Sequence, residues 1–242
     1  MPRAALVVLA AIALSVAGCG GGESSKTTPS TSAPTTAKRP PRPRGPIPPA
    51  LRTVESASED TIDFALAGRR DKAIRTSRAL KKAADGPAAA ELRAAGVSAG
   101  IIDAFRDRAH EVARLAPKAD LLRVALASNR AFGMVPGFFA LYRSAVPATV
   151  TRLDYLDFEA KLRSRAGDAG PVLAAVERLD ATWTALRPDF VRAGGRRVAP
   201  RFDAHVRAMR RLASAGDLAR AQKEAQHGLD LVDELEQVYE RK

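Results

Sequence analysis

The spacing of the apolar residues is the feature that most limits how this chain can fold. From Leu51 onward alanine and leucine recur every three or four residues, and runs of β-branched residues are few. In the last segment one face of a helix collects Leu218, Ala221, Ala225, Leu229, Val232, Leu235 and Tyr239. The sequence therefore predicts an all-α fold with no strand of any length.

Glycine and proline indicate where these helices end. We expect breaks at residues 68–71, 85–87, 96, 117, 147, 167–171, 188, 194–195 and 216. The segments between them have the length of ordinary helices. Together they are long enough to build one substantial core or two small ones.

The two halves of the helical region resemble each other. Ala67-Gly68 aligns with Ala166-Gly167, and Tyr142 aligns with Tyr239. Each half reads as two helices, a short linking turn and two more helices, which predicts a duplicated helical bundle. Residues 51–146 and 147–242 would then form two four-helix units of about 95 residues, side by side or fused. A stack of helical hairpins is the alternative, but its usual period of about 34 residues does not fit.

Residues 1–50 differ sharply from the rest. Arg3 precedes an apolar run from Ala4 to Val16, which is shorter than the ~20 residues of a membrane-spanning helix and typical of an export signal. It ends at Cys19, the only cysteine. Residues 20–50 are rich in Gly, Ser, Thr and Pro and carry basic side chains, which predicts a disordered tether.

The motif Val16-Ala17-Gly18-Cys19 resembles the lipobox of bacterial lipoproteins. The resemblance implies that residues 1–18 are a lipoprotein signal peptide, cleaved before Cys19. It also implies a diacylglycerol on the Cys19 thiol and an acyl chain such as palmitate on the new amino end. Residues 19–50 would be the lipid anchor and tether, and the implied location is the extracytoplasmic face of a cell membrane. A lipidated Cys19 leaves no thiol for redox or metal chemistry.

The charge of the chain bears on its partners. The formal net charge is +12, and basic residues alternate with acidic ones instead of forming one stripe. For an exported protein we expect no nucleic-acid partner. The charge favours anionic polymers of the cell envelope or membrane headgroups, and an envelope protein is a further candidate.

No catalytic residue is assigned. Gly96-Val97-Ser98-Ala99-Gly100 has the spacing of a hydrolase nucleophile turn, but helix-forming residues precede it where a strand is required. We expect Ser98 to cap a helix through its side-chain oxygen. The acidic runs at 154–159 and 230–240 are interpreted as solvated helix faces, partly ion-paired, with Lys161 four residues after Asp157. We expect a protein that is not an enzyme and holds no cofactor.

The segment 129–143 is the candidate ligand site. It holds three phenylalanines around Gly133, Pro136 and Gly137, and we interpret it as a helix bent by proline. An apolar pocket lined by Phe132, Met134, Phe138 and Phe139 is one hypothesis. A kinked helix packed tightly in the core is the alternative.

Histidine is scarce, and its pattern assigns no metal site. His205 borders an apolar stripe, whereas His227 lies opposite the stripe of its helix, so we expect only His205 to face inward. The exported helical character is similar to bacterial iron-uptake lipoproteins, but no histidine-glutamate signature supports that resemblance. The predicted function is non-catalytic binding or scaffolding in the envelope. The alternatives are a binder of small apolar ligands and a helper that handles iron, copper or zinc.

Overall fold

Helices make up most of residues 44–241, the part of the chain that the computed structural model describes. The expected signal peptide, Cys19 and the tether up to residue 43 lie outside these residues. Among the described helices, none combines the length and the apolar character needed to span a bilayer. The all-α prediction is confirmed.

The elements follow one another in the order that the glycine and proline breaks predicted. The first part contains α1 (Pro49–Leu66), α2 (Arg70–Asp85), α3 (Pro87–Ala94), α4 (Ala99–Leu115), α5 (Leu121–Phe132) and the single-turn α6 (Val135–Phe139). The second part contains α7 (Ala148–Ala166), α8 (Ala169–Arg192), the 3-10 turn η1 (Gly195–Arg197), α9 (Ala199–Ser214) and α10 (Leu218–Glu240).

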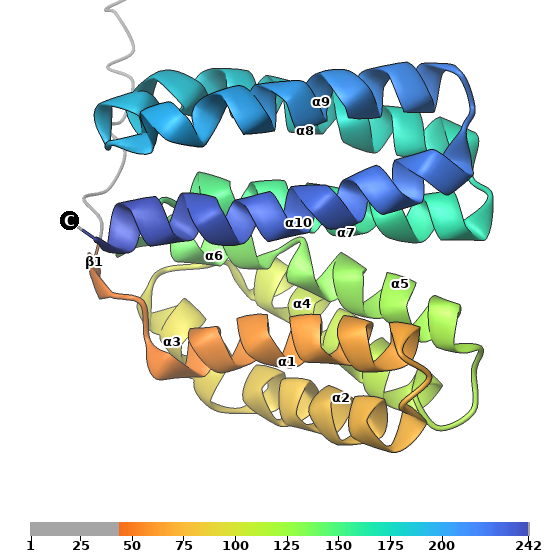
Figure 1. Cartoon of the computed structure of the whole chain (residues 1–242). Coiled ribbons are helices and arrows are strands. Elements are labelled where there is room, and N and C mark those ends of the chain that lie inside the picture. Colours follow the sequence, from red (N-terminus) through yellow and green to blue (C-terminus); the bar gives the residue numbers. More distant parts are fainter. Residues whose placement is uncertain (1–43, 242) are drawn as a thin grey trace, which may run out of the picture. The chain divides into compact units, whose positions relative to one another are not determined.

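Each long helix packs against two other long helices of its own half of the chain. Helix α1 contacts α2 and α5, and α4 contacts the same two helices. In the same way α7 contacts α8 and α10, and α9 contacts both of these. Helices α5 and α6 also pack against α7 within the compact unit Pro41–Lys242. In Figure 1, α7 and α10 lie between the α8–α9 pair and the side that holds α1 and α5.

The apolar faces meet in well-packed clusters. Phe105 and Phe132 are fully buried among α1 to α6. In the second part Trp183 lies between Phe190 and Phe202, with ring centroids 5.8 and 4.6 Å away. Burial of each such ring contributes roughly 1.5–3 kcal/mol, so these clusters stabilise the helices more than their intrinsic propensities do.

Glycines end several helices as predicted. Gly68 follows α1 and Gly167 follows α7, with φ angles of +74° and +80° that only glycine adopts without strain. The break predicted at Pro188 is wrong, because α8 continues through it to Arg192. Leu186 and Phe190, on either side of this proline, are both buried, and their packing holds the helix despite the lost hydrogen bond.

The expectation of no strand is also corrected. A short β1 (Arg44–Pro46) pairs in parallel with β2 (Tyr142–Arg143). Pro46 and Pro48 keep this stretch extended, because proline disfavours the helical conformation of the residue before it. The pairing fixes the entry of the chain into α1 beside the end of α6.

The segment 129–143 is not one bent helix. Helix α5 ends at Phe132, and α6 begins anew at Val135 with Pro136 in its first turn, where no N–H is required. Gly133 at the junction lies against the ring of Tyr155, and a Cβ atom there would be 2.7 Å from that ring. Close packing on α7, more than proline strain, therefore sets the direction of α6.

Candidate functional site

An apolar pocket of about 520 Å³ opens where α6 meets the loop between α3 and α4. Its volume is in the range of small-molecule sites. The side of α6 and the chain after it contribute Met134, Phe138 and Leu141, and the start of α4 contributes Ile101. Ile101 is 48% exposed, which is unusual for so large an apolar side chain in this fold. We call this site the apolar pocket; it is lined by Ala95, Gly96, Val97, Ser98, Ile101, Gly133, Met134, Gly137, Phe138, Leu141 and Arg152.

The four residues that the sequence suggested for a pocket lie in three different places. Met134 and Phe138 line the apolar pocket, and Phe138 also packs edge-on against Phe105 at 5.3 Å. Phe132 is fully buried against Phe158 and does not reach the pocket. Phe139 points to another cleft, between α1 and α10. The four residues separate because adjacent residues on a helix face different directions.

Two features of the apolar pocket were not predicted from the sequence. Arg152 reaches the rim from α7, and among residues 44–241 it forms no ion pair with a carboxylate. Val97 and Ile101 come from the α3–α4 side. The one sequence signal for this side was the pair Ile101-Ile102, because only one of two neighbouring isoleucines in a helix can face the core.

A second hollow is lined by acidic side chains from α1, α7 and α10. It consists of two adjoining cavities of about 370 and 190 Å³, which share Glu59, Asp154 and Asp233. We call it the carboxylate cleft; its acidic residues are Glu55, Glu59, Asp63, Asp154, Asp230, Asp233, Glu236 and Glu240.

Burial, followed by the repulsion of neighbouring carboxylates, raises the pKa values of several of these carboxyl groups. Burial and the neighbouring Glu236 raise the pKa of Glu55 to about 7. Burial and the neighbouring Asp233 raise the pKa of Glu236, also to about 7. Burial, together with Glu55, raises the pKa of Glu59 to about 8, and burial raises the pKa of Asp154 well above its usual range. Near neutral pH the cleft is therefore poised between protonated and charged states.

Besides the residues of the carboxylate cleft, the interpretation of the acidic runs as solvated faces is wrong for Asp157 and Glu159. Asp157 is fully buried and lies 3.0 Å from His205 Nε2. Glu159 is 7% exposed, accepts a hydrogen bond from Asn129 and pairs with Arg163. Lys161 does not pair with Asp157 but donates to Gln226. The spacing within one helix could not show that His205 of α9 contacts Asp157 and that Asn129 of α5 contacts Glu159.

His205 lies in a buried polar network. Its Nδ1 is 3.0 Å from Glu224 Oε1, so both ring nitrogens face carboxylates. Burial alone lowers the pKa of His205, but Asp157 and Glu224 outweigh it and raise the pKa to about 9. His227 is exposed, as expected, with its ring centroid 6.4 Å from that of His205. Within residues 44–241, no three His, Cys, Asp or Glu side chains form a group that could hold a metal ion.

Ser98 occupies the N-cap position of α4 but forms no side-chain capping hydrogen bond, contrary to the prediction. Ser98 instead lines the apolar pocket. Gly96, with φ of +80°, ends the preceding helical segment as expected. The segment before it is α3, so the strand that a nucleophile turn needs is not there.

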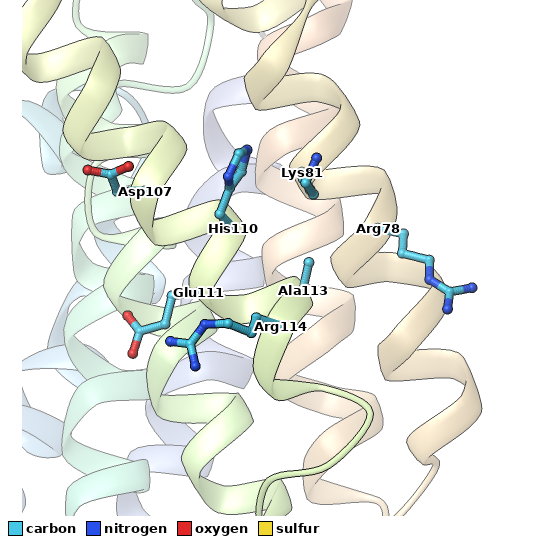
Figure 2. A pocket seen from close by; sticks show the side chains of 7 residues that line it. All are labelled: Arg78, Lys81, Asp107, His110, Glu111, Ala113 and Arg114. Carbon is cyan, nitrogen blue, oxygen red and sulfur yellow. The ribbon is translucent and has the colours of Figure 1, made fainter.

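A third hollow, of about 540 Å³, lies on the surface between α2 and α4. Figure 2 shows His110 in the space between the two helices, while Asp107 and Glu111 point away from α2. Asp85 anchors this side, with its carboxylate 2.6 Å from His110 and 2.7 Å from Lys81. We call it the basic pocket because Arg78, Lys81, His110 and Arg114 all line it.

Comparisons with protein families, with curated proteins and with solved structures found no match to this chain.

Proposed function

We propose that this protein is a lipid-anchored envelope protein whose helical domain binds a small ligand with an apolar body and an anionic end. The observation that carries the proposal is the apolar pocket, in which Met134, Phe138 and Ile101 surround a space of about 520 Å³. A pocket of mainly apolar lining with a single cation at its rim suits an amphipathic anion. Arg152 supplies that cation.

The proposed role is binding, not catalysis. Ser98 is the one side-chain hydroxyl that lines the apolar pocket, and neither a histidine nor a carboxylate lines the pocket beside it. A nucleophile needs a base within hydrogen-bond distance to be activated. The contacts of the pocket therefore support recognition of a ligand, in keeping with the binding or scaffolding role inferred from the sequence.

The test fills the apolar pocket without disturbing the fold. A Cβ atom at Gly137 meets nothing within 4 Å, so Gly137→Leu places its side chain in the pocket. Gly170→Leu is the matched control, because its Cβ is equally unobstructed and the residue lies outside the pocket. The probe is octanoate, added to the full chain in phosphatidylcholine nanodiscs, and the fluorescence of Trp183, the single tryptophan, reports thermal unfolding.

We expect octanoate to raise the unfolding midpoint of the wild type and of Gly170→Leu, because a ligand that binds only the folded state stabilises it. Gly137→Leu should lose this response. Octylammonium, which has a similar apolar chain and the opposite charge, should bind about tenfold more weakly or worse, and Arg152→Gln should remove the difference. Equal responses of the two leucine variants would contradict the proposal.

The anchor is part of the same proposal and rests on the lipobox at Val16 to Cys19. In cells fed an alkynyl palmitate analogue, we expect the wild-type chain to incorporate the label and to sediment with membranes. Cys19→Ser should do neither. Incorporation by Cys19→Ser would show that the lipid is attached elsewhere.

An anionic envelope polymer is a second candidate partner, favoured by the basic pocket. Arg78, Lys81 and Arg114 gather there in a chain of net charge +12. Such binding should weaken steeply with salt, since exposed charges are screened within about 10 Å at 0.1 M ionic strength. Sedimentation with a polyanionic wall polymer at rising salt would test it, with Arg78→Gln expected to release the protein at lower salt.

We also infer that the chain contains two related four-helix units. The support is the shared element order, a short α3 or η1 after each pair of helices, and left-handed glycines at Gly68 and Gly167 in equivalent turns. Native-state hydrogen exchange should separate α1, α2, α4 and α5 from α7 to α10 as two cooperative units. One common opening of all eight helices would instead indicate a fused bundle.

A further inference from the structure

The end of the helical unit at which the chain enters the fold is built from four separate segments. Strand β1 leads into α1 and pairs with β2, and the apolar pocket joins the α3–α4 loop to α6 and to the start of α7. Val146, before α7, and Val198, before α9, pack on one apolar cluster. In Figure 1, β1 and α3 lie on the same side of the view. We call this the entry end; its segments are residues 44–54, 93–102, 140–153 and 190–202.

Arginine is the one charged residue type in these four segments, which contain no Asp, Glu or Lys. The opposite end differs, because an aspartate stands at the N-cap or in the first turn of α2, α5, α8 and α10. Positive charge is therefore interrupted by acids at the opposite end and not within the segments of the entry end. The arginines of the entry-end segments are Arg44, Arg52, Arg93, Arg143, Arg152, Arg192, Arg196, Arg197 and Arg201.

Several of these arginines have no carboxylate to neutralise them. Arg192 pairs with Asp189, and Arg201 pairs with Glu234. Exposed cations without an intramolecular partner remain available to an anion outside the fold. Among residues 44–241, four exposed arginines of the entry end have no carboxylate within ion-pair distance: Arg93, Arg152, Arg196 and Arg197.

The connection between α8 and α9 holds two of these arginines in a fixed turn. Gly194 has φ of +108°, and the buried Gly195 lies so close to the ring of Phe190 that a Cβ atom there has no room. The backbone is thus pressed onto the core, while Arg196 and Arg197 of η1 stay exposed. A turn that is already fixed loses little conformational entropy when it binds a partner.

An exposed apolar side chain lies at the same end. Ile101, at the apolar pocket, is 48% exposed. Among residues 44–241 the other large apolar side chain that is exposed is Leu173, near the start of α8 at the opposite end. Basic residues beside an exposed apolar side chain are typical of surfaces that lie on a bilayer. The cations bind anionic headgroups, and the apolar side chain enters the interface.

The position of the proposed anchor favours the same orientation, and this step rests on the anchor of the proposed function. Residues 20–43 separate Cys19 from β1, and a coil of that length spans roughly 25–30 Å. Helix α8, with 24 residues, is about 36 Å long. The anchor therefore keeps the entry end close to the bilayer, whereas the opposite end lies about one helix length farther from it.

The carboxylate cleft is the acidic part of this end. Arg52 and Arg143 line the cleft together with its carboxyl groups. Burial raises the pKa of Glu55 and of Glu236 to about 7, so part of the negative charge of the cleft is neutralised near neutral pH. The cleft therefore opposes an anionic surface less than its eight acidic residues suggest.

We propose that the entry end docks on an anionic phospholipid bilayer, with Arg93, Arg152, Arg196 and Arg197 on the headgroups and Ile101 in the interface. The apolar pocket, which Ile101 and Arg152 line, then opens at the bilayer surface. This deepens the proposed function, because the amphipathic anion that suits the pocket becomes a lipid drawn from the bilayer.

The first experiment measures sedimentation of the full chain with rising amounts of phosphatidylglycerol or phosphatidylcholine vesicles. Every sample carries Cys19→Ser, so binding does not depend on the anchor. Arg196→Gln with Arg197→Gln removes two charges from the entry end. Lys118→Gln with Arg123→Gln is the matched control, because it removes two exposed charges without an ion pair from the opposite end.

We expect the entry-end double variant to bind phosphatidylglycerol about tenfold more weakly than its parent or worse, since each basic residue near an anionic bilayer contributes about a fivefold change. The opposite-end double variant should differ from the parent by less than about twofold. Phosphatidylcholine should bind all three chains weakly. The unfolding midpoint, read from the fluorescence of Trp183, should be the same in all three, because only exposed side chains are changed.

A second readout locates the contact. Ile101→Trp and Leu173→Trp place a tryptophan at the two exposed apolar positions, one at each end. In phosphatidylglycerol vesicles with brominated acyl chains, which quench tryptophan on contact, we expect Ile101→Trp to lose much of its fluorescence. Leu173→Trp should respond like the chain without either substitution, in which Trp183 is buried.

Three outcomes would overturn the proposal. Equal binding by the two double variants would place the contact elsewhere, and equal binding of the parent to both lipids would remove the role of charge. Binding that needs Arg196 and Arg197 but leaves Ile101→Trp unquenched would make a soluble polyanion the partner. Because no sample carries the anchor or octanoate, these failures leave the tests of Cys19 and of the apolar pocket untouched.

Discussion

At the scale of single residues, the network around His205 shows how closely the second group of helices is fitted. Asp157 from α7, His205 from α9 and Glu224 from α10 join three helices through two hydrogen bonds of 3.0 Å. Such a network costs free energy to bury, and the two hydrogen bonds of His205 offset part of that cost, although the second carboxylate oxygen of Asp157 has no hydrogen-bond partner among the described residues. Gly228 on α10 makes room for it, because any Cβ there would lie 2.5 Å from His205 Nε2 and 2.6 Å from Asp157 Oδ2.

We therefore expect Gly228→Ala to lower the free energy of unfolding by about 1–3 kcal/mol, since the methyl group must displace buried polar atoms. Chemical denaturation followed by the fluorescence of Trp183 measures this. Gly170→Ala is the control: its Cβ meets nothing, and removing a helical glycine should stabilise the protein by about 0.5–1 kcal/mol. A neutral Gly228→Ala would show that α10 can shift away from the network at little cost.

At the scale of elements, the ends of the helices are held in different ways. Asp120 caps α5 and accepts hydrogen bonds from the backbone N–H groups of Leu122 and Arg123, at 2.9 and 3.3 Å. Ser98 stands at the same position before α4 without such a bond. Helix α5 carries Phe132 and leads into α6, so its first turn helps to fix the apolar pocket.

Replacing Asp120 by alanine should cost about 1 kcal/mol of stability, the usual value of a lost N-cap. Ser98→Ala should cost only a few tenths of this, because no capping bond is lost. Denaturant midpoints of the two variants, measured side by side, decide the matter. If Ser98→Ala proves as costly as Asp120→Ala, the hydroxyl of Ser98 caps α4 in solution after all.

At the scale of the whole molecule, the carboxylate cleft sets how stability depends on pH. The ordinary pKa of a glutamate is 4.5. In the folded protein the pKa of Glu55 and of Glu236 is raised to about 7, and that of Glu59 is raised to about 8. The folded state thus holds more protons than the unfolded chain between these values. The contribution of these three carboxyl groups to the free energy of unfolding is present in full below pH 4.5 and is lost as the pH rises through 7 to 8. Glu224 acts in the opposite direction, because hydrogen bonding to His205 lowers its pKa. Glu224 therefore stabilises the fold above pH 4.5, and this stabilisation is lost as the pH falls.

We expect the unfolding midpoint of the wild type to fall between pH 5 and pH 8, by several degrees at low salt. Glu236→Gln should flatten this slope, whereas Glu177→Gln should leave it unchanged. Scanning calorimetry at fixed ionic strength measures the profile. A midpoint that rises over this range would mean that the cleft carboxylates are paired with cations in solution.

Much of the fold follows from local patterns in the sequence. Apolar periodicity and the breaks at Gly68, Gly96 and Gly167 place the helices, because each of these signals acts within a few residues along the chain. The break predicted at Pro188 is wrong because contacts between helices, which the local sequence does not contain, outweigh the local signal there. Only the packing of Leu186 and Phe190 against other helices explains why α8 continues through it.

What the sequence by itself determined is the class of the fold, the order of its helices and the inward position of His205. What only the tertiary structure decided is which side chains from different helices meet. It separated Phe138 in the apolar pocket from Phe132 in the core, and it turned acidic residues that read as solvated into the carboxylate cleft. The physical reason is that a helix has one periodicity, readable from its own residues, whereas a site depends on the rotation and register of its neighbours, which are set by packing over the whole core.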